Sequence, residues 1–149
     1  MLPKQESELL SLSNREVELL QEMSGIIGTN PRAIKRFVNV YQIVRAHEGL
    51  GTTPGTDEEY LVLMILLALP IGNYKSLYKH TMRLSPDEFH TFGDFLKHID
   101  KSYQDDLQAK KLEEYIESTS SKGLILGLRL DVLINQNEFI RRFTFSEIA

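Results

Sequence analysis

The chain of 149 residues contains no cysteine. It can therefore form no disulfide, no cysteine-ligated zinc site and no thiol nucleophile, and this absence fits a cytosolic protein. Long apolar runs are also missing: the longest, Leu61 to Ile71, is about half of the roughly 20 residues that a membrane-spanning helix needs. The polar N-terminus has no apolar signal core. We expect a cytoplasmic protein without membrane insertion, in which residues 61–71 form a buried helix.

Positive charge is scarcer than negative charge. The sequence has 17 Lys and Arg against 21 Asp and Glu, which gives a formal net charge of -4 at pH 7. Because a domain dedicated to duplex DNA is usually basic, this balance argues against nucleic acid as a partner. The hydrophobic fraction of 42% excludes a mainly disordered chain and is sufficient for the core of one domain.

Helix signals are strong along the chain, whereas strand alternation is nearly absent. We therefore predict an all-α fold, a single compact helical domain of six or seven helices. The domain is expected to cover 13–145, between a flexible N-terminal segment, 1–12, and a C-terminal tail, 146–149. Expected helix starts are the capping box Ser13–Glu16, Asn30 followed by Pro31, Asp57, Tyr74, Ser85 followed by Pro86, Ser102 and Asp131.

The helix ends are predicted from glycine, proline and hydroxyl-rich breaks. They are expected near Gly28, His47, Pro70 to Gly72, Met82, Asp100, Ser118 and Phe143. The segment Leu124 to Leu130 fits either a short strand or a buried helical turn. No internal repeat divides the chain further.

One helix start is unusual in its charge. No Asp or Glu occurs between Glu22 and Glu48, although the chain as a whole is acidic. Just after the expected cap, this stretch carries three cations, Arg32, Lys35 and Arg36. The N-terminus is the positive end of the helix dipole, so cations near it are electrostatically unfavourable. A bound anion would offset this repulsion. We therefore expect these three side chains to meet an anion.

A helical wheel divides the same segment into two faces. The apolar face, which is expected to pack on the core, carries Ala33, Ile34, Phe37, Val40, Tyr41 and Val44. The polar face carries Arg32, Lys35, Arg36, Asn39 and Gln42, with Ile43 as an apolar exception. Arg32 lies closest to the helix start, and a guanidinium can bind a phosphate through two hydrogen bonds at once.

The string Asn30-Pro-Arg-Ala-Ile-Lys-Arg-Phe-Val-Asn39 resembles a signature near the C-terminal end of KAP-type P-loop NTPases, a branch of the AAA+-like ATPases. In that family such a string opens a helix after the nucleotide-binding core. The segment Arg141-Arg-Phe-Thr-Phe145 is similar to the Arg-Phe-Ser-Phe ending common in the family. With the helix order between the two motifs, the resemblance covers about 13–145.

The resemblance implies a helical lid with a regulatory role. In AAA+-like enzymes an arginine at the start of a lid helix senses the nucleotide phosphates, and Arg32 matches that position. Lys35 and Arg36 match the family string and would support phosphate binding or hold the lid on the core. The implied partner is a P-loop NTPase core, in cis or in trans, which would bind ATP and Mg²⁺.

The catalytic parts of such an enzyme are absent from this sequence. It contains no G-x-x-x-x-G-K-[ST] motif and no apolar strand that ends in a magnesium-binding Asp. We therefore expect no ATP hydrolysis by this chain alone, and no cofactor of its own. It is expected to be the C-terminal piece of a longer NTPase or a free-standing relative of that piece.

Two other functions remain open. A nucleic-acid-binding helical module would use Arg32, Lys35, Arg36 and Arg45, and its affinity would fall steeply with salt. A protein-interaction module would dock through an exposed apolar patch and would show self-association.

No other group of residues indicates a catalytic or metal site. His90 and His98 are about two helical turns apart, too far to share a metal, and no HExxH motif occurs. The acidic pairs at 105–106 and 113–114 lie among lysines, which is typical of surface pairs on a helix. The hydroxyl run 118–121 indicates a loop. The aromatic residues with helical spacing, expected in the core, are Tyr74, Tyr78, Phe89, Phe92 and Phe95.

Overall fold

The computed structural model describes residues 12–48, 56–85, 87–103 and 107–143. Within these ranges the chain is all-α, as predicted, with eight α-helices rather than six or seven, one 3₁₀ turn and no strand. The elements are α2 (Asn14–Met23), η1 (Ser24–Ile26), α3 (Pro31–Glu48), α4 (Asp57–Ile71), α5 (Lys75–Thr81), α6 (Phe92–Ser102), α7 (Gln108–Glu117), α8 (Lys122–Leu126) and α9 (Leu130–Phe143).

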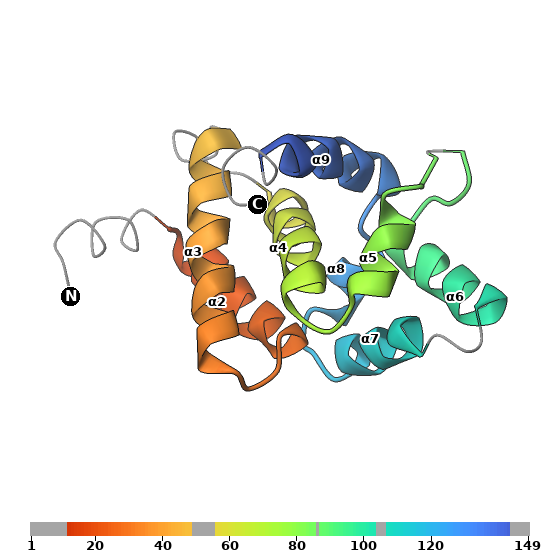
Figure 1. Cartoon of the computed structure of the whole chain (residues 1–149), viewed down its shortest axis with the longest axis horizontal. Coiled ribbons are helices and arrows are strands. Elements are labelled where there is room, and N and C mark those ends of the chain that lie inside the picture. Colours follow the sequence, from red (N-terminus) through yellow and green to blue (C-terminus); the bar gives the residue numbers. More distant parts are fainter. Residues whose placement is uncertain (1–11, 49–55, 86, 104–106, 144–149) are drawn as a thin grey trace, which may run out of the picture.

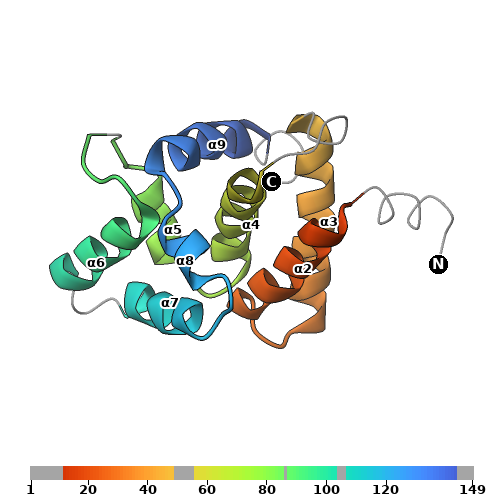
Figure 2. The same cartoon turned by 180° about the vertical axis from the view of Figure 1, so that it is seen from behind.

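Helix α4 is the centre of the fold. Every residue from Tyr60 to Leu69 is buried, because the helix is apolar on all sides and must be covered all round. It packs against α2 and α3, and also against α5, α8 and α9 (Figures 1 and 2). Helices α6 and α7 pack on each other; α6 lies at the end of the molecule opposite α2 and α3, whereas α7 also contacts η1. No helix in the described part of the chain combines the length and apolarity needed to cross a membrane.

The start of α4 differs by one residue from the prediction. Thr56, not Asp57, caps the helix: its hydroxyl accepts a hydrogen bond from the Glu59 backbone N–H at 3.2 Å. The Glu59 carboxylate accepts one from the Thr56 backbone N–H in return. Asp57 then lies in the acidic first turn, where it favours the helix dipole. Pro70 lies inside the last turn, and Gly72 caps it.

A buried carboxylate joins α2 to α3. Glu16 has no exposed surface, and its two oxygens accept hydrogen bonds from the guanidinium of Arg45 and from the hydroxyl of Tyr41, the latter at 2.7 Å. The same carboxylate also accepts from the backbone N–H of Ser13, which completes the predicted capping box of α2. Burial and the bond to Glu16 raise the pKa of Tyr41, so its hydroxyl remains a donor. Because every oxygen of this cluster is engaged, it fixes α3 against α2.

The expected helix start at Ser85 is wrong. Ser85 begins only a turn, and α6 starts six residues after Pro86, with Thr91 as its N-cap. The Thr91 hydroxyl accepts from the backbone N–H of Asp94 at 3.2 Å. The residues before α6 pair with a distant segment instead: Thr91 forms an isolated bridge with Arg129. This pairing holds the segment extended, so the helix cannot begin earlier.

Two further boundaries also differ from the sequence-based ones. Ser102 ends α6 instead of starting the next helix, and α7 begins at Gln108 without a side-chain cap. The segment 124–130 contains the end of the short helix α8 and then the bridge residue Arg129, so it is partly helical and partly extended. Residues 1–11 and 144–149, which hold most of the two expected terminal segments and the end of the second motif, lie outside the described ranges.

Replacing Glu16 with alanine tests the α2–α3 connection. Removing one partner of a buried ion pair leaves the other charge uncompensated, so Glu16→Ala should lower the free energy of unfolding by about 3–5 kcal/mol. Urea denaturation followed by circular dichroism measures this change. The control is Glu18→Ala on the same helix, which removes an exposed ion pair with Arg15 and should cost less than about 1 kcal/mol. Equal losses in the two variants would contradict the role given to Glu16.

Candidate functional site

The start of α3 is capped as predicted. The side-chain oxygen of Asn30 accepts hydrogen bonds from the backbone N–H groups of Arg32 at 3.0 Å and Ala33 at 3.3 Å. Gly28, with a φ of 99°, turns the chain out of the preceding element in the left-handed region that favours glycine. Since Asn30 already satisfies these N–H groups, an anion at this helix start depends on side chains rather than on free backbone donors.

The three predicted site residues are all exposed. Arg32, Lys35 and Arg36 lie on the outer face of α3, whereas Phe37, Val40, Tyr41 and Val44 on its other face are buried, as the wheel predicted. Within the described ranges no ion pair joins any of the three cations to an acidic residue. The three side chains are therefore available to a negatively charged ligand or surface.

Arg45 does not belong to this exposed group. It was expected to contribute to a nucleic-acid-binding surface, but it is buried, with 6% of its surface exposed, and is paired with Glu16. The sequence alone did not show whether Arg45 is exposed or buried in an ion pair, because its partner Glu16 is 29 residues away along the chain. Its charge is used inside the domain, to hold α3 on α2.

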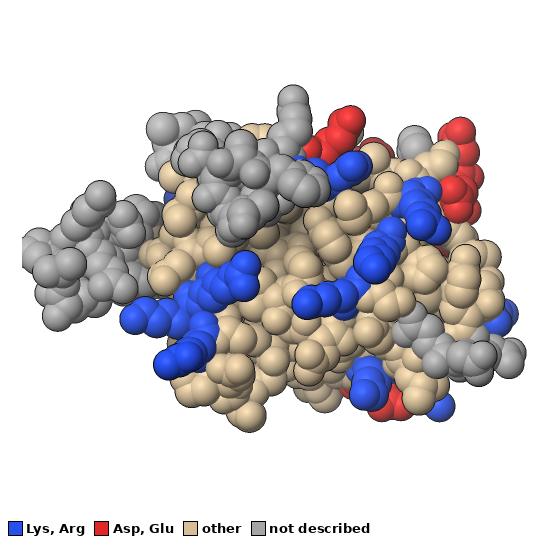
Figure 3. All heavy atoms as spheres, in the orientation of Figure 1, with Lys and Arg blue, Asp and Glu red and all other residues tan. Residues whose placement is uncertain are grey.

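A second row of cations, which the sequence analysis did not recognise, lies on and after α5. Lys75, Lys79 and Arg83 follow one another at intervals of four residues and are all exposed. A feature of the sequence could have indicated this row: a second stretch without acidic residues, in which no Asp or Glu occurs between Glu59 and Asp87. Figure 3 shows Lys and Arg side chains gathered over α3 and along α5, with no acidic side chain visible between them.

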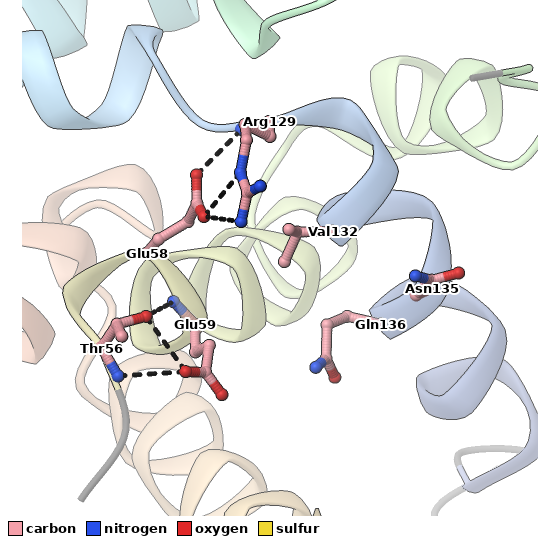
Figure 4. Close-up of a pocket in the computed structure, with 7 residues that line it drawn as sticks. All are labelled: Thr56, Glu58, Glu59, Arg129, Val132, Asn135 and Gln136. Atoms are coloured by element: carbon pink, nitrogen blue, oxygen red, sulfur yellow. Dashed lines mark hydrogen bonds and ion pairs between the residues drawn. The ribbon is translucent and has the colours of Figure 1, made fainter.

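An open pocket of about 410 Å³ lies between the start of α4 and α9. Figure 4 shows its polar lining, in which the Glu58 carboxylate accepts two hydrogen bonds from the Arg129 guanidinium, at 2.9 and 3.0 Å. Glu59 is engaged in the cap of α4, so the two pocket carboxylates already have partners. The bonds of Glu58 support the junction between α4 and the segment before α9, and those of Glu59 support the cap of α4.

The hydroxyl run between α7 and α8 is a loop, as predicted, and it binds the end of α2. The Glu22 carboxylate accepts hydrogen bonds from the backbone N–H of Ser121 at 2.9 Å and from its hydroxyl at 3.0 Å. The Tyr115 hydroxyl donates to the backbone oxygen of Glu22, and a Cβ on Gly25 would overlap that ring. These contacts fix the turn that leads into α3 and thereby position Arg32.

Histidine, acidic and aromatic residues make up the other candidate groups in the sequence. No group of three or more His, Asp or Glu side chains in these ranges could hold a metal ion. Burial, and the nearby charge of Asp100, raise the pKa of Glu113, but Glu114 beside it is exposed. The acidic pair at 105–106 lies outside the described residues. Phe92 and Phe95 are buried, and Tyr74, Tyr78 and Phe89 pack against the core, which confirms their predicted role.

Comparisons of the chain with known proteins identify no related protein. No protein-family model matches the chain, and no match is found among curated proteins or solved structures. Function is therefore argued from the residues and from the motif around Arg32.

The contact between Glu22 and Ser121 predicts a dependence of stability on pH. Burial acts to raise the pKa of Glu22, but the hydrogen bonds from Ser121 and Ser120 outweigh it, so the net shift is downward from 4.5. A depressed folded-state pKa stabilises the fold above the unfolded pKa, and this contribution is lost as pH falls through the folded value. The free energies of unfolding of wild type and Glu22→Gln should therefore differ by a constant amount above about pH 5 and converge below it.

Chemical denaturation between pH 3 and pH 7 measures the difference. Glu18→Gln is the matched control, since Glu18 lies on the same helix with an exposed side chain. A difference between wild type and Glu22→Gln that stays constant down to pH 3 would contradict the stabilising role of the ionised Glu22.

Proposed function

We propose that this domain is the C-terminal helical lid of a KAP-type P-loop NTPase and that Arg32 senses the phosphates of ATP bound to the P-loop core. The observation that carries the proposal is the position of Arg32: exposed, without an acidic partner in the described chain, and at the first turn of a firmly packed helix. The resemblance of Asn30–Asn39 to the family signature supplies the identity of the anion.

The packing of α3 supports this role, because a phosphate sensor must be held in place before the ligand arrives. The buried cluster of Glu16, Tyr41 and Arg45 fixes the second half of α3, and Asn30 fixes its first turn. Arg32 therefore projects from a rigid helix, and only its side chain has to be ordered. A preorganised guanidinium stabilises the charge of a transferring phosphoryl group without reorganisation of the protein.

The rest of the chemistry belongs to the core. ATP and Mg²⁺ are bound there, and the core supplies the P-loop lysine and the magnesium-binding acid. This chain contributes Arg32, with Lys35 and Arg36 one turn further along α3, as positive charges on the lid. The proposed enzyme is cytoplasmic, and the core is joined to the lid in the same chain or in a second one.

A protein-interaction module is less well supported. The exposed large apolar residues within the described ranges come from several elements. They are Val17, Ile43, Met82, Tyr103, Leu107 and Leu124. Interfaces between proteins depend on a contiguous, well-packed centre, and no single element in the described ranges supplies several of these residues.

Arg32→Ala in the protein that contains both lid and P-loop core should reduce kcat for ATP hydrolysis on the order of 10³-fold, because arginines that contact a transferring phosphoryl group contribute about that much or more. Steady-state phosphate release measures the rate, and thermal unfolding should be nearly unchanged since Arg32 is exposed. Arg15→Ala is the control: it removes another exposed arginine, paired with Asp57 and Glu18, and should leave turnover unchanged.

Two results would contradict the proposal. The first is unchanged turnover in Arg32→Ala. The second is the absence of a Walker A sequence both upstream in the same reading frame and in any protein that copurifies with this domain.

A further inference from the structure

The charge of the domain is segregated along the sequence and in space. All 21 acidic residues lie outside two stretches, 23–47 and 60–86. The first stretch supplies the exposed cations of α3, and the second supplies those of α5 and its C-terminal end. We name these six side chains the basic face: Arg32, Lys35, Arg36, Lys75, Lys79 and Arg83.

The fold brings the two rows to the same side of the molecule. Helices α3 and α5 both pack against α4 (Figure 1), and packed helices lie about 8–10 Å apart, so the axes of α3 and α5 are within about 20 Å of each other. Figure 3 shows both rows in one view, with neutral atoms between them. None of the six forms an ion pair within the described ranges. A single bound nucleotide is too small to contact both rows at this separation. If a nucleotide binds to the α3 row, the α5 row is left for another anion.

We propose that the basic face binds the phosphate backbone of a nucleic acid. Lys75 and Lys79 are about 6 Å apart along α5, and Arg83 follows in the turn after the helix, so the row presents several charges in succession. In a duplex, where each strand has a phosphate about every 3.4 Å of helix axis, a distance of about 20 Å between the two rows corresponds to roughly six base pairs. Such binding is electrostatic and independent of sequence, since no described element projects from this face to read bases.

An acidic protein surface would be the other polyanion, and the apolar content of the face argues against it. Protein interfaces draw their affinity from exposed apolar and aromatic anchors near the centre. Here the apolar neighbours of the cations, Ile34, Val38 and Tyr74, are packed against the core. The only large exposed apolar residues on α3 and at the end of α5 are Ile43 and Met82. A phosphate backbone requires no such anchors.

The net charge of -4 is no obstacle to this face. It is an average over a molecule whose acidic residues lie on other segments, and a nucleic-acid strand responds to the local charge, because interactions beyond about 8–10 Å are screened at physiological salt.

The proposed nucleic-acid binding does not depend on the proposed role of the domain as an NTPase lid. Lys75, Lys79 and Arg83 have no role in sensing ATP, so variants of the α5 row test it separately from Arg32.

The experiment measures binding of two fluorescein-labelled probes, a 20-nucleotide oligothymidine and a 20-base-pair duplex of mixed sequence, by anisotropy between 50 and 200 mM salt. The variants are Lys75→Gln/Lys79→Gln on the α5 row and Lys35→Gln/Arg36→Gln on α3. The matched control is Lys110→Gln/Lys111→Gln, which removes two exposed lysines from α7. Because all these side chains are exposed, the variants should fold, which circular dichroism checks.

For wild type we expect binding at 50 mM salt to at least one probe. With the single strand, the plot of log affinity against log salt should have a slope of about -4 if all six cations engage, from about 0.7 per contact. Each double variant of the basic face should reduce that slope by about 1.4 and weaken binding at 50 mM salt roughly 10- to 100-fold. The α7 control should leave both unchanged.

Three results would overturn the proposal. One is no binding of either probe at 50 mM salt. Another is an equal loss in the α7 control, which would indicate attraction without a defined site. The last is displacement of the bound probe by poly-L-glutamate as effectively as by an unlabelled probe of equal charge, which would assign the face to an acidic protein instead.

Discussion

The buried carboxylate of Glu16 is the interaction on which the arrangement of the basic helix depends. A lone ionised carboxylate in an apolar core is strongly unfavourable, so its burial requires charge and hydrogen bonds from its neighbours. Arg45 and Tyr41 supply them from α3, and the backbone of Ser13 supplies another from the start of α2. The same side chain thus caps one helix and fixes the next, which leaves α3 a single direction relative to α2.

This constraint separates two kinds of cation on one helix. Arg45 is turned inward and neutralised, whereas Arg32, Lys35 and Arg36 are turned outward and have no described acidic partner. The apolar helix α4 then sets the position of α5, which carries its own exposed lysines to the same side. A rigid scaffold with an unneutralised positive face is suited to anions that another molecule supplies, whether a nucleotide on a P-loop core or the backbone of a strand.

Local signals in the sequence predicted the local structure well. The cap at Asn30, the two faces of α3 and the burial of α4 all depend on residues within one or two turns of each other, and each was confirmed. Two of the errors have non-local causes. The start of α6 depends on pairing between Thr91 and Arg129, and the burial of Arg45 depends on Glu16, which looked like an ordinary capping residue. Neither partner can be identified from spacing, because the contacts join segments far apart in the chain.

The most direct test of the proposed role of Arg32 is a crystal structure of this chain together with the P-loop core proposed for it, with Mg²⁺ and a non-hydrolysable ATP analogue bound. The account predicts that the Arg32 guanidinium lies within hydrogen-bond distance, up to about 3.2 Å, of a phosphate oxygen, while Asn30 still caps α3. A closed complex in which Arg32 faces solvent, or in which this end of α3 points away from the nucleotide, would contradict it.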